Sequence, residues 1–539
     1  MKPAAPAPTT APPLAAPASL GPSRFERAFP LLLTGLLLLG YALRLRAWFF
    51  APSLTGDEAM LAAGVSKASL ARAFAPLPWD RVAAPGFVLL IRGATSLLGE
   101  SERVLRAVPL VAGLVSLPLF AAVAHRLLSK PVALLALFAF AILAPIVRAS
   151  NEASPAAVDL AAALAILDAT LRSLDRRVSA RRGAVYALAG VALLLVSNVA
   201  IVGLLAAGAT LGLRAIHRRA PRAARRAGSL LVVWVGAFVA LWLLAPSGTI
   251  AGTHLADPAG RLRAPWPTSA SALGWYVGAY FDVFRDPTGF LQPALAAAAA
   301  IVGLHVLGRR SLTWVATLVL PVALALLASR LAGHPFGGRA VLFLVPSALL
   351  LAFAGLDELR RIPGRPLWFV VAASALLLQP LVAALSELRS PEDREEVRPV
   401  LSALVARVRP GDAVYVHEFA MPQVEWYLAH GLAWPAGVEV IRAAPSPDFV
   451  APTGSTRLFT RPTTLEAELV EVPPRPPRTR VWALLAHEAD TALYAMRRAT
   501  AETFQRAGFL DDADEARGLD ARGATVSLFV AATEPTTVR

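Results

Sequence analysis

Residues 29–50 read FPLLLTGLLLLGYALRLRAWFF, and this mostly apolar stretch decides the class of fold. A helix needs about 20 such residues to cross a bilayer, so the stretch predicts a membrane-spanning helix. The chain continues through APSLTG at residues 51–56 to two adjacent carboxylates, Asp57 and Glu58. Carboxylates beside a membrane segment are candidates for proton chemistry at the lipid boundary, although a solvated loop is the plainer interpretation of two residues alone.

Composition extends the membrane prediction to the whole chain. Of its 539 residues 56% are hydrophobic, and apolar runs of span length recur, which predicts a polytopic membrane protein. The absence of cysteine excludes disulfides and thiolate metal sites. The net charge of +15 comes mainly from arginines in short loops, which is typical of cytoplasmic loops. No motif that reads nucleic acid accompanies this charge, so we expect no nucleic-acid partner.

Basic loops give an orientation and a span count. Residues 1–24 are rich in Pro and Ala and predict a disordered tail, which Lys2 and the arginines around residue 25 place in the cytoplasm. Alternation from there predicts about eleven spans. They are residues 29–50, 104–128, 131–147, 156–172, two within 183–213 that turn at Ser197-Asn198, 228–246, 291–307, 311–329, 340–356 and 367–386. Residues 83–99 are short and interrupted by Arg92, which favours a helix lying in the outer interface.

The character of the chain changes near residue 388. Mixed charge replaces the long apolar runs, with helix-like stretches at 393–408 and 489–507 and strand-like runs at 413–416, 481–485 and 525–531. We therefore expect a transmembrane domain over residues 25–387 and a soluble α/β domain over 388–539. An odd number of spans places the soluble domain outside, which for a bacterial inner membrane is the periplasm.

Polar residues gather at the predicted outer ends of the spans. They are Asp57, Glu58, Arg81, Glu102, Arg106, Arg148, Glu152, His334 and Arg339. Their common side indicates a membrane-embedded cavity that opens outward. The alternative for any one of them is a side chain that reaches from a helix end to water.

The order of these features resembles a known family. An Asp-Glu loop follows the first span, and after it come Ala84-Pro85-Gly86-Phe87 and the stretch GESERVLRAVP at residues 99–109. A later span is entered through residues 148–155. Near the end of the membrane part, a loop with Gly337-Gly338-Arg339 precedes a span that contains Pro346. This layout resembles the protein O-mannosyltransferase and aminoarabinose-transferase group of GT-C glycosyltransferases. The resemblance covers roughly residues 25–390 and is strongest over 56–160.

The resemblance implies that a sugar moves from a polyprenyl-phosphate donor to an acceptor on the outer side, with inversion. The acceptor is a lipid, a glycan or a protein, and the enzyme is a hexosyl or pentosyl transferase. In this interpretation Asp57 is the general base, and Glu58 orients the base or the acceptor. A positive charge stabilises the donor phosphate, and three arginines are expected to bind it: Arg339, Arg81 and Arg148. Three residues are assigned to the cavity or the acceptor: Glu152, Glu102 and His334.

The chain departs from the family pattern at Val82-Ala83-Ala84-Pro85-Gly86. Many relatives carry an acidic residue or His, and a Lys or a second Pro, around this proline. A metal ligand or lysine contact is therefore missing here, unless Arg81 or Lys67 supplies the positive charge. We expect no cofactor and no required metal, and the adjacent pair His417-Glu418 is not a metal site either.

Two other classes of function stay open. A transporter or lipid flippase would show charged or broken helices near the bilayer midplane and inverted repeats, whereas the charges here gather at one face. A non-catalytic protein of envelope polysaccharide assembly would not need Asp57. In the soluble domain, GDAVYV at 411–416 and EWY at 425–427 resemble a segment of bacterial members of the group, but core packing is the favoured explanation of these aromatic residues.

Overall fold

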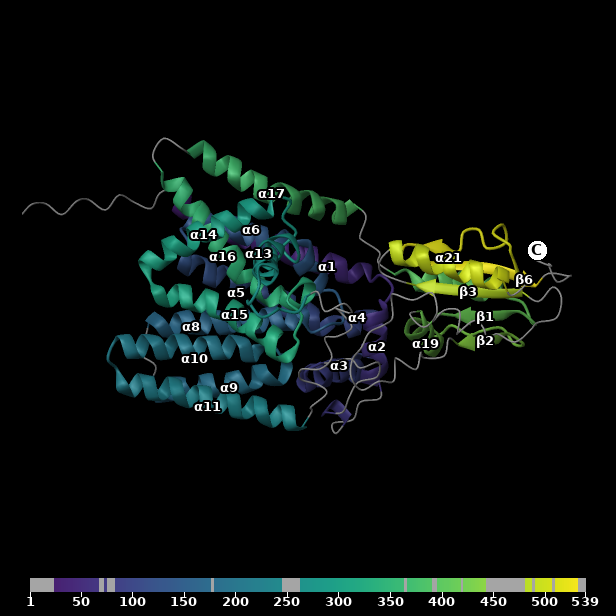
Figure 1. Ribbon diagram of the computed structural model, residues 1–539, viewed down its shortest axis with the longest axis horizontal. Coiled ribbons are helices and arrows are strands. Elements are labelled where there is room, and N and C mark those ends of the chain that lie inside the picture. The colour runs from purple at the N-terminus through teal and green to yellow at the C-terminus, as the bar shows by residue number, and fades with distance from the viewer. Residues whose placement is uncertain are drawn as a thin grey trace, which may run out of the picture.

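The structure, a computed structural model, describes residues 24–66, 72–74, 83–175, 179–244, 262–362, 366–389, 395–417, 420–442, 480–486, 490–506 and 509–531. A long helical bundle occupies the first part of the chain, and a smaller α/β domain lies beyond one end of it (Figure 1). Four predicted features lie outside the described residues, namely the tail before residue 24, Lys67, Arg81 and Glu418.

Twelve of the described helices run along the bundle or continue a helix that does. They are α1 (Arg24–Phe50), α5 (Ala107–Leu127), α6 (Lys130–Ile142), α7 (Ala144–Ala149), α8 (Ala156–Asp175), α9 (Ala180–Val196), α10 (Ala200–His217), α11 (Pro221–Leu244), α14 (Pro293–Arg310), α15 (Leu312–Ala332), α16 (Val345–Arg361) and α17 (Pro366–Arg389). Among the described residues, seven helices are long and apolar enough to cross a membrane. The other predicted spans coincide with α6, α8, α9 and α14, so the prediction of a many-spanning helical protein is confirmed.

One predicted span is not a single helix. The stretch 131–147 divides into α6 and α7 at Leu143, and Pro145 stands in the first turn of α7. Proline has no N–H and crowds the preceding helical turn, which favours a break here, although other helices of the bundle continue through an internal proline: Pro30, Pro118, Pro321 and Pro380. The break turns the chain before it reaches Arg148.

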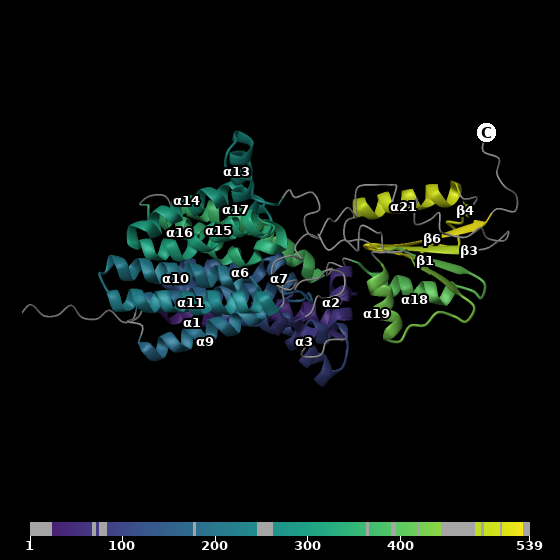
Figure 2. The ribbon, with the colours of Figure 1, turned by 60° about the horizontal axis from the view of Figure 1, so that its bottom comes forward.

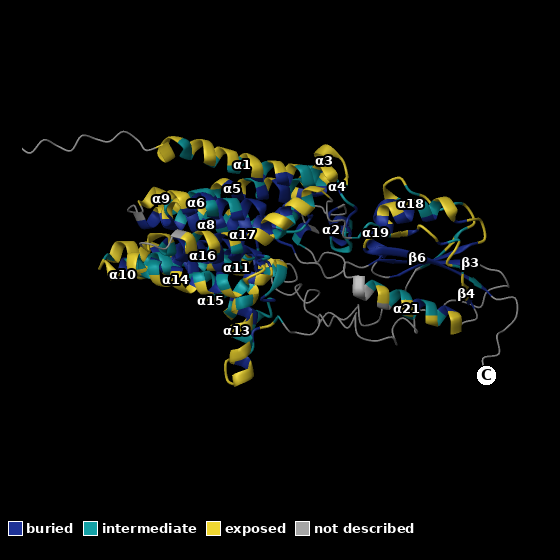
Figure 3. Cartoon of the chain, turned by 90° about the horizontal axis from the view of Figure 1, so that it is seen from above, coloured by how far each residue is buried: buried dark blue, intermediate teal, exposed yellow. Residues whose placement is uncertain are grey.

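Six shorter helices in the described part of the chain lie at one end of the bundle or project from it. They are α2 (Gly56–Ser66), η1 (Arg72–Phe74), α3 (Pro85–Leu98), α4 (Glu102–Leu105), α13 (Ala270–Arg285) and the 3₁₀ helix η4 (Gly338–Leu344). Helix α3 coincides with the helix expected at residues 83–99, and its place in the membrane interface stays a prediction. Helix α13 was not predicted, and it projects from the side of the bundle, across the direction of the long helices (Figures 2 and 3).

Residues predicted for the same membrane face meet in space. At one end of the bundle Ser129 donates a hydrogen bond to Asp357 at 2.7 Å, and Lys130 lies 3.5 Å from Glu26. At the other end Asp57 and Arg339 are in contact. The two ends therefore separate the residues as the alternation of spans requires. We call the end that carries Asp57 the outer end.

Helix α16 runs through the middle of the bundle and is its most buried span. It touches α14 backbone to backbone, because a Cβ built on Gly355 would lie 2.0 Å from the carbonyl oxygen of Ala299. A Cβ on Gly303 would likewise lie 1.9 Å from the oxygen of Leu351. Glycines at such a contact let two helices approach closely where no hydrophobic effect drives them together.

The C-terminal domain is one mixed sheet with helices on both faces. Its strands are β1 (Ala413–Val416), β2 (Glu439–Arg442), β3 (Arg480–Ala486), β4 (Phe509–Asp511), β5 (Asp520–Ala521) and β6 (Ala524–Ala531), in the order β2-β1-β3-β6-β4 with β5 paired to β6. β1 pairs in parallel with β2 and β3, and β6 pairs antiparallel with β3 and β4. Within its described residues the helices are α18 (Val397–Arg407), α19 (Met421–Ala429) and α21 (Asp490–Arg506). Helix α21 covers one face, and α18 and α19 cover the other (Figure 2).

The domain is packed onto the outer end of the bundle through a shared hydrophobic core. Leu54 and Phe87 from the membrane part belong to the same buried cluster as Trp426 of α19 and Trp482 of β3. Strand residues alternate between the two faces, so Tyr415 points to the other core, against Phe504 of α21. The aromatic residues of EWY therefore do pack in a core, and this core reaches the loop before Asp57.

Candidate functional site

The N-terminus of α2 is fixed by a capping box. Thr55 precedes the helix, and its hydroxyl oxygen accepts a hydrogen bond from the Glu58 backbone N–H at 3.4 Å. The Thr55 N–H in turn donates to Glu58 Oε2 at 3.0 Å. This reciprocal arrangement satisfies two backbone donors that a helix start leaves open. It holds Asp57 in the first turn of α2, where its side chain is 42% exposed.

Glu58 is a buried structural carboxylate. Its two oxygens accept hydrogen bonds from Arg106 at 2.7 and 2.6 Å, and Oε1 also accepts the Ala153 N–H at 2.7 Å. Burial opposes the charged form, but the Arg106 guanidinium and the hydrogen bonds outweigh it and hold the pKa of Glu58 below its usual value. Glu58 thus ties α2 to the start of α5 and to the loop before α8.

Three predicted residues converge at the outer end. Nη2 of Arg339 lies 3.2 Å from Asp57 Oδ2, and its Nη1 donates to Glu152 Oε1. Glu152 is buried, whereas the side chains of Asp57 and Arg339 are 42% and 46% exposed. The cluster therefore has a buried acid on one side of the guanidinium and an accessible acid on the other.

The loop that carries Arg339 is shaped by a glycine. Gly338 has a φ of +51°, a left-handed conformation that residues with a Cβ rarely adopt. A Cβ there would also lie 3.7 Å from Asp286 Oδ2, so Asp286 borders the cluster. Burial and the neighbouring Asp282 raise the pKa of Asp286, against the opposing charges of Arg148 and Arg339. Asp286 is a site residue that the sequence analysis missed.

The remaining predicted residues lie in different surroundings. Glu102 accepts hydrogen bonds from Tyr427 and Arg398, both at 2.5 Å, and so joins α4 to the C-terminal domain. His334 stands before η4 with its Nε2 3.4 Å from the Ala340 carbonyl oxygen, and burial lowers its pKa despite this contact. Arg148 lies near enough to Asp286 to influence its pKa.

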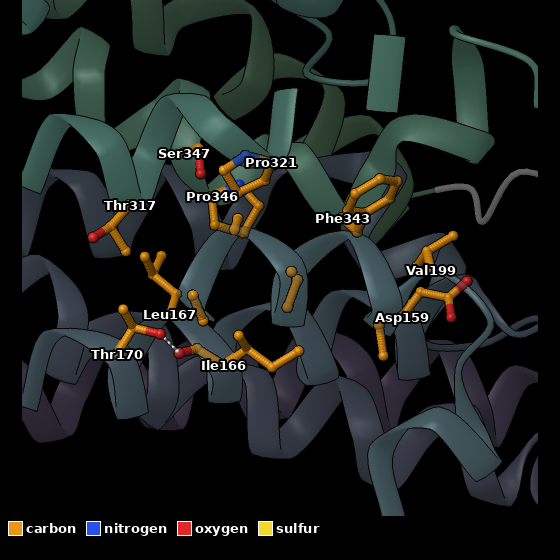
Figure 4. A pocket seen from close by; sticks show the side chains of 15 residues that line it. Asp159, Ile166, Leu167, Thr170, Val199, Thr317, Pro321, Phe343, Pro346 and Ser347 are labelled. Atoms are coloured by element: carbon orange, nitrogen blue, oxygen red, sulfur yellow. Dashed lines mark hydrogen bonds between the residues drawn. The ribbon is translucent and has the colours of Figure 1, made fainter. Parts of the chain in front are cut away.

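A separate apolar pocket lies deeper, between α8, α10, α15 and α16 (Figure 4). Its volume is about 30 Å³, room for one or two water molecules and too little for a lipid chain in this conformation. Asp159, in the first turn of α8, lines it together with Val199 and Phe343. Asp159 accepts a hydrogen bond from the Ser197 hydroxyl at 2.6 Å, which fastens the turn between α9 and α10.

No group of three or more His, Cys, Asp or Glu suited to a metal ion occurs among the described residues. The absence of a metal requirement stays a prediction.

No protein-family model matches the chain, and no curated protein sequence matches it. Solved structures are similar to it. The oligosaccharyltransferase of Archaeoglobus fulgidus in complex with zinc and sulfate aligns with a TM-score of 0.52 at 13% identity, over 89% of this chain and 71% of that one. The same organism's AglB, with an inhibitory peptide and a dolichol-phosphate, aligns with a TM-score of 0.50 at 12% identity, over 91% and 73%. Apo ArnT from Cupriavidus metallidurans gives 0.49 at 14% identity, over 94% and 99%. The first two likenesses show that the chain has the GT-C fold, as the sequence resemblance predicts.

Proposed function

We propose that the chain is a glycosyltransferase that moves a hexosyl or pentosyl group from a polyprenyl-phosphate donor to an acceptor at the outer end of the bundle. The observation that carries this proposal is the contact of Arg339 with both Asp57 and Glu152. It supplies a carboxylate that water or an acceptor can reach beside a cation suited to phosphate, at the boundary where a lipid-linked donor would present its head group.

The reaction is a displacement at the anomeric carbon. The acceptor hydroxyl oxygen forms a bond to that carbon as the bond to the phosphate oxygen breaks, and polyprenyl phosphate leaves. Asp57 takes the proton of the hydroxyl, and attack from the face opposite the leaving group inverts the configuration. Glu58 has no direct part in this mechanism, because its two oxygens are occupied by Arg106 and backbone N–H groups. It positions the first turn of α2.

Arg339 serves the leaving group. As a phosphate gains charge when the sugar departs, a guanidinium stabilises it through charge-assisted hydrogen bonds. A bound phosphate would compete with Asp57 for Arg339, so donor binding frees the base. Arg148 adds positive charge nearby, and Asp286 is a candidate contact for the sugar or the acceptor. The AglB structure, which holds a dolichol-phosphate, supports a lipid phosphate as the ligand class.

The proposal places the protein in the bacterial inner membrane, with its N-terminus in the cytoplasm and the C-terminal domain in the periplasm. Membrane lipids surround the bundle, and the acceptor is a lipid, a glycan or a protein. Arg81 remains a predicted phosphate contact.

The test is a transfer assay with the purified full chain in lipid vesicles and a panel of polyprenyl-phosphate sugars. Release of polyprenyl phosphate from one donor, and inverted configuration in the product, is the expected result. A folded protein that releases nothing from any donor, with lipid, glycan and peptide acceptors supplied, contradicts the proposal and favours the transport or assembly alternatives.

A further inference from the structure

The backbone that leads into Asp57 is held by side chains of the C-terminal domain. Residues 53–55 are not in a helix or strand, and Gly56 begins α2, so the N–H groups of residues 53–56 have no partner in an earlier helical turn and need other acceptors. Three of these four N–H groups donate to the C-terminal domain. The bonds are Ser53 N–H to Glu396 Oε1 at 3.1 Å, Leu54 N–H to Tyr427 Oη at 2.8 Å, and Gly56 N–H to Glu395 Oε2 at 2.7 Å.

These acceptors are themselves held in place. Gln423 of α19 donates to Glu395 Oε2 and lies 3.5 Å from the Leu54 carbonyl oxygen. Tyr427, from the same helix, donates its hydroxyl to Glu102 at 2.5 Å. Leu54 and Gln423 are fully buried and Tyr427 is 5% exposed, so water cannot easily replace these bonds. Burial raises the pKa of the Tyr427 hydroxyl, and so does Glu102, which keeps the hydroxyl protonated as a donor.

The bundle also forms hydrogen bonds to this segment, from the other side. Arg106 donates to the carbonyl oxygens of Pro52 and Ser53 at 2.8 and 3.1 Å while it pairs with Glu58. The segment therefore lies between the membrane part and the C-terminal domain, with buried hydrogen bonds to both. Asp57 is the next residue, so a shift of the domain moves Asp57 relative to Arg339.

We propose that the C-terminal domain is a positioning element of the active site, in which Glu395, Gln423 and Tyr427 fix residues 53–56 and so aim the Asp57 carboxylate. The inference rests on the proposed function, because it concerns how that base is directed. A displacement of about 1 Å in a catalytic group can lower the rate about 100-fold, so such contacts matter although none of them touches the substrate.

The experiment uses the full chain in lipid vesicles. Glu395→Ala removes the acceptor of the Gly56 N–H, whereas Glu395→Gln keeps an oxygen there. Tyr427→Phe removes the bonds to Leu54 and Glu102 and preserves the ring. Glu502→Ala and Tyr494→Phe are matched controls, because both side chains lie exposed on α21.

Two readouts are taken from every variant: kcat and KM for the donor, and hydrogen exchange of the amides in residues 53–58. We expect Glu395→Ala and Tyr427→Phe to lower kcat about 10- to 100-fold, with donor KM changed less than about threefold. Exchange at Gly56 should become about tenfold faster in Glu395→Ala, because its N–H loses its acceptor. Glu395→Gln should recover most of kcat, and both controls should match the wild type.

Unchanged kcat in both Glu395→Ala and Tyr427→Phe overturns the inference. So does a loss of kcat with unchanged exchange in residues 53–58, since the loss then has another cause. If the wild type transfers no sugar, the proposed function fails instead. The hydrogen-exchange data then test the positioning role by themselves, and unchanged exchange in Glu395→Ala shows that the C-terminal domain does not hold residues 53–56.

Discussion

Replacing Glu58 by glutamine tests the structural basis of the site, because it removes one charge of the pair that fastens α2. Both partners are almost fully buried, with side-chain exposures of 1% for Glu58 and 2% for Arg106. The variant leaves the Arg106 charge buried and uncompensated, a change that typically costs about 3–5 kcal/mol. Arg106 keeps its bonds to Pro52 and Ser53, so we expect a loss near the lower limit, about 3 kcal/mol.

Pulse proteolysis of the full chain in lipid, as a function of denaturant, measures this loss. Glu100→Gln is the matched control, since Glu100 and its two partners, Arg92 and His430, are about one-quarter to one-third exposed and such pairs contribute about 0.2–1 kcal/mol each. A loss in Glu58→Gln no larger than that of Glu100→Gln would refute the assignment of Glu58 as a structural carboxylate.

Acid pH should have the same effect as this substitution. The pKa of Glu58 is lower in the folded protein than in the unfolded chain, where it is about 4.3. Its contribution to stability is therefore complete above that value and is lost as the pH falls through the folded-state pKa. We expect the stability difference between wild type and Glu58→Gln to shrink below about pH 4. A difference that stays constant down to pH 3 contradicts this.

Three further predictions concern other parts of the molecule. Arg339→Ala should raise the donor KM by about tenfold or more, through the loss of a charge-assisted phosphate contact, and an unchanged donor KM argues against that contact. Gly355→Ala should destabilise the bundle by about 1–3 kcal/mol, because its Cβ would meet the α14 backbone. Gly228→Ala, which has open space around it, should be neutral or slightly stabilising. Equal losses of stability in the two variants, measured by proteolysis, would contradict the close α14–α16 contact. Reporter fusions at positions 57 and 420 should report the same, periplasmic side, and opposite sides would overturn the span count.

The spans were predictable from sequence because apolar length and basic loops are local signals. The turn at Ser197, the helix that begins at Pro85 and three of the strands follow from the same kind of pattern. The break before Pro145 was not predicted, and proline alone does not decide it, since α5 and α15 continue through a proline. Helix α13 was missed because its apolar residues do not reach span length. Strands β4 and β5 are too short to show a period, and β2 (EVIR), although as long as β1, has only two apolar residues between charged ones.

The site was predictable in part. Asp57, Glu152 and Arg339 were expected on one face and do meet. The capping box of Thr55 was readable as Thr-x-x-Glu, and it would have assigned Glu58 a structural part. Glu102 was expected in the cavity, but its partners come from the C-terminal domain, about 300 residues away in the chain. Contacts across such distances leave no pattern in a single sequence. This also explains why Asp286 and Glu395 were not found, and why Tyr427 was noted only as part of EWY and not as a contact of the segment before Asp57.

The central claim is that Asp57 takes the acceptor's proton, and the turnover of Asp57→Asn tests it most directly. The variant is assayed in lipid vesicles with the donor that the wild type uses, beside Asp514→Asn, which makes the same substitution at an exposed site of the C-terminal domain. We expect Asp57→Asn to remain folded and to lose about 10²- to 10⁴-fold in kcat, the usual contribution of a general base, while Asp514→Asn retains wild-type turnover. Wild-type turnover in a folded Asp57→Asn protein would contradict the account.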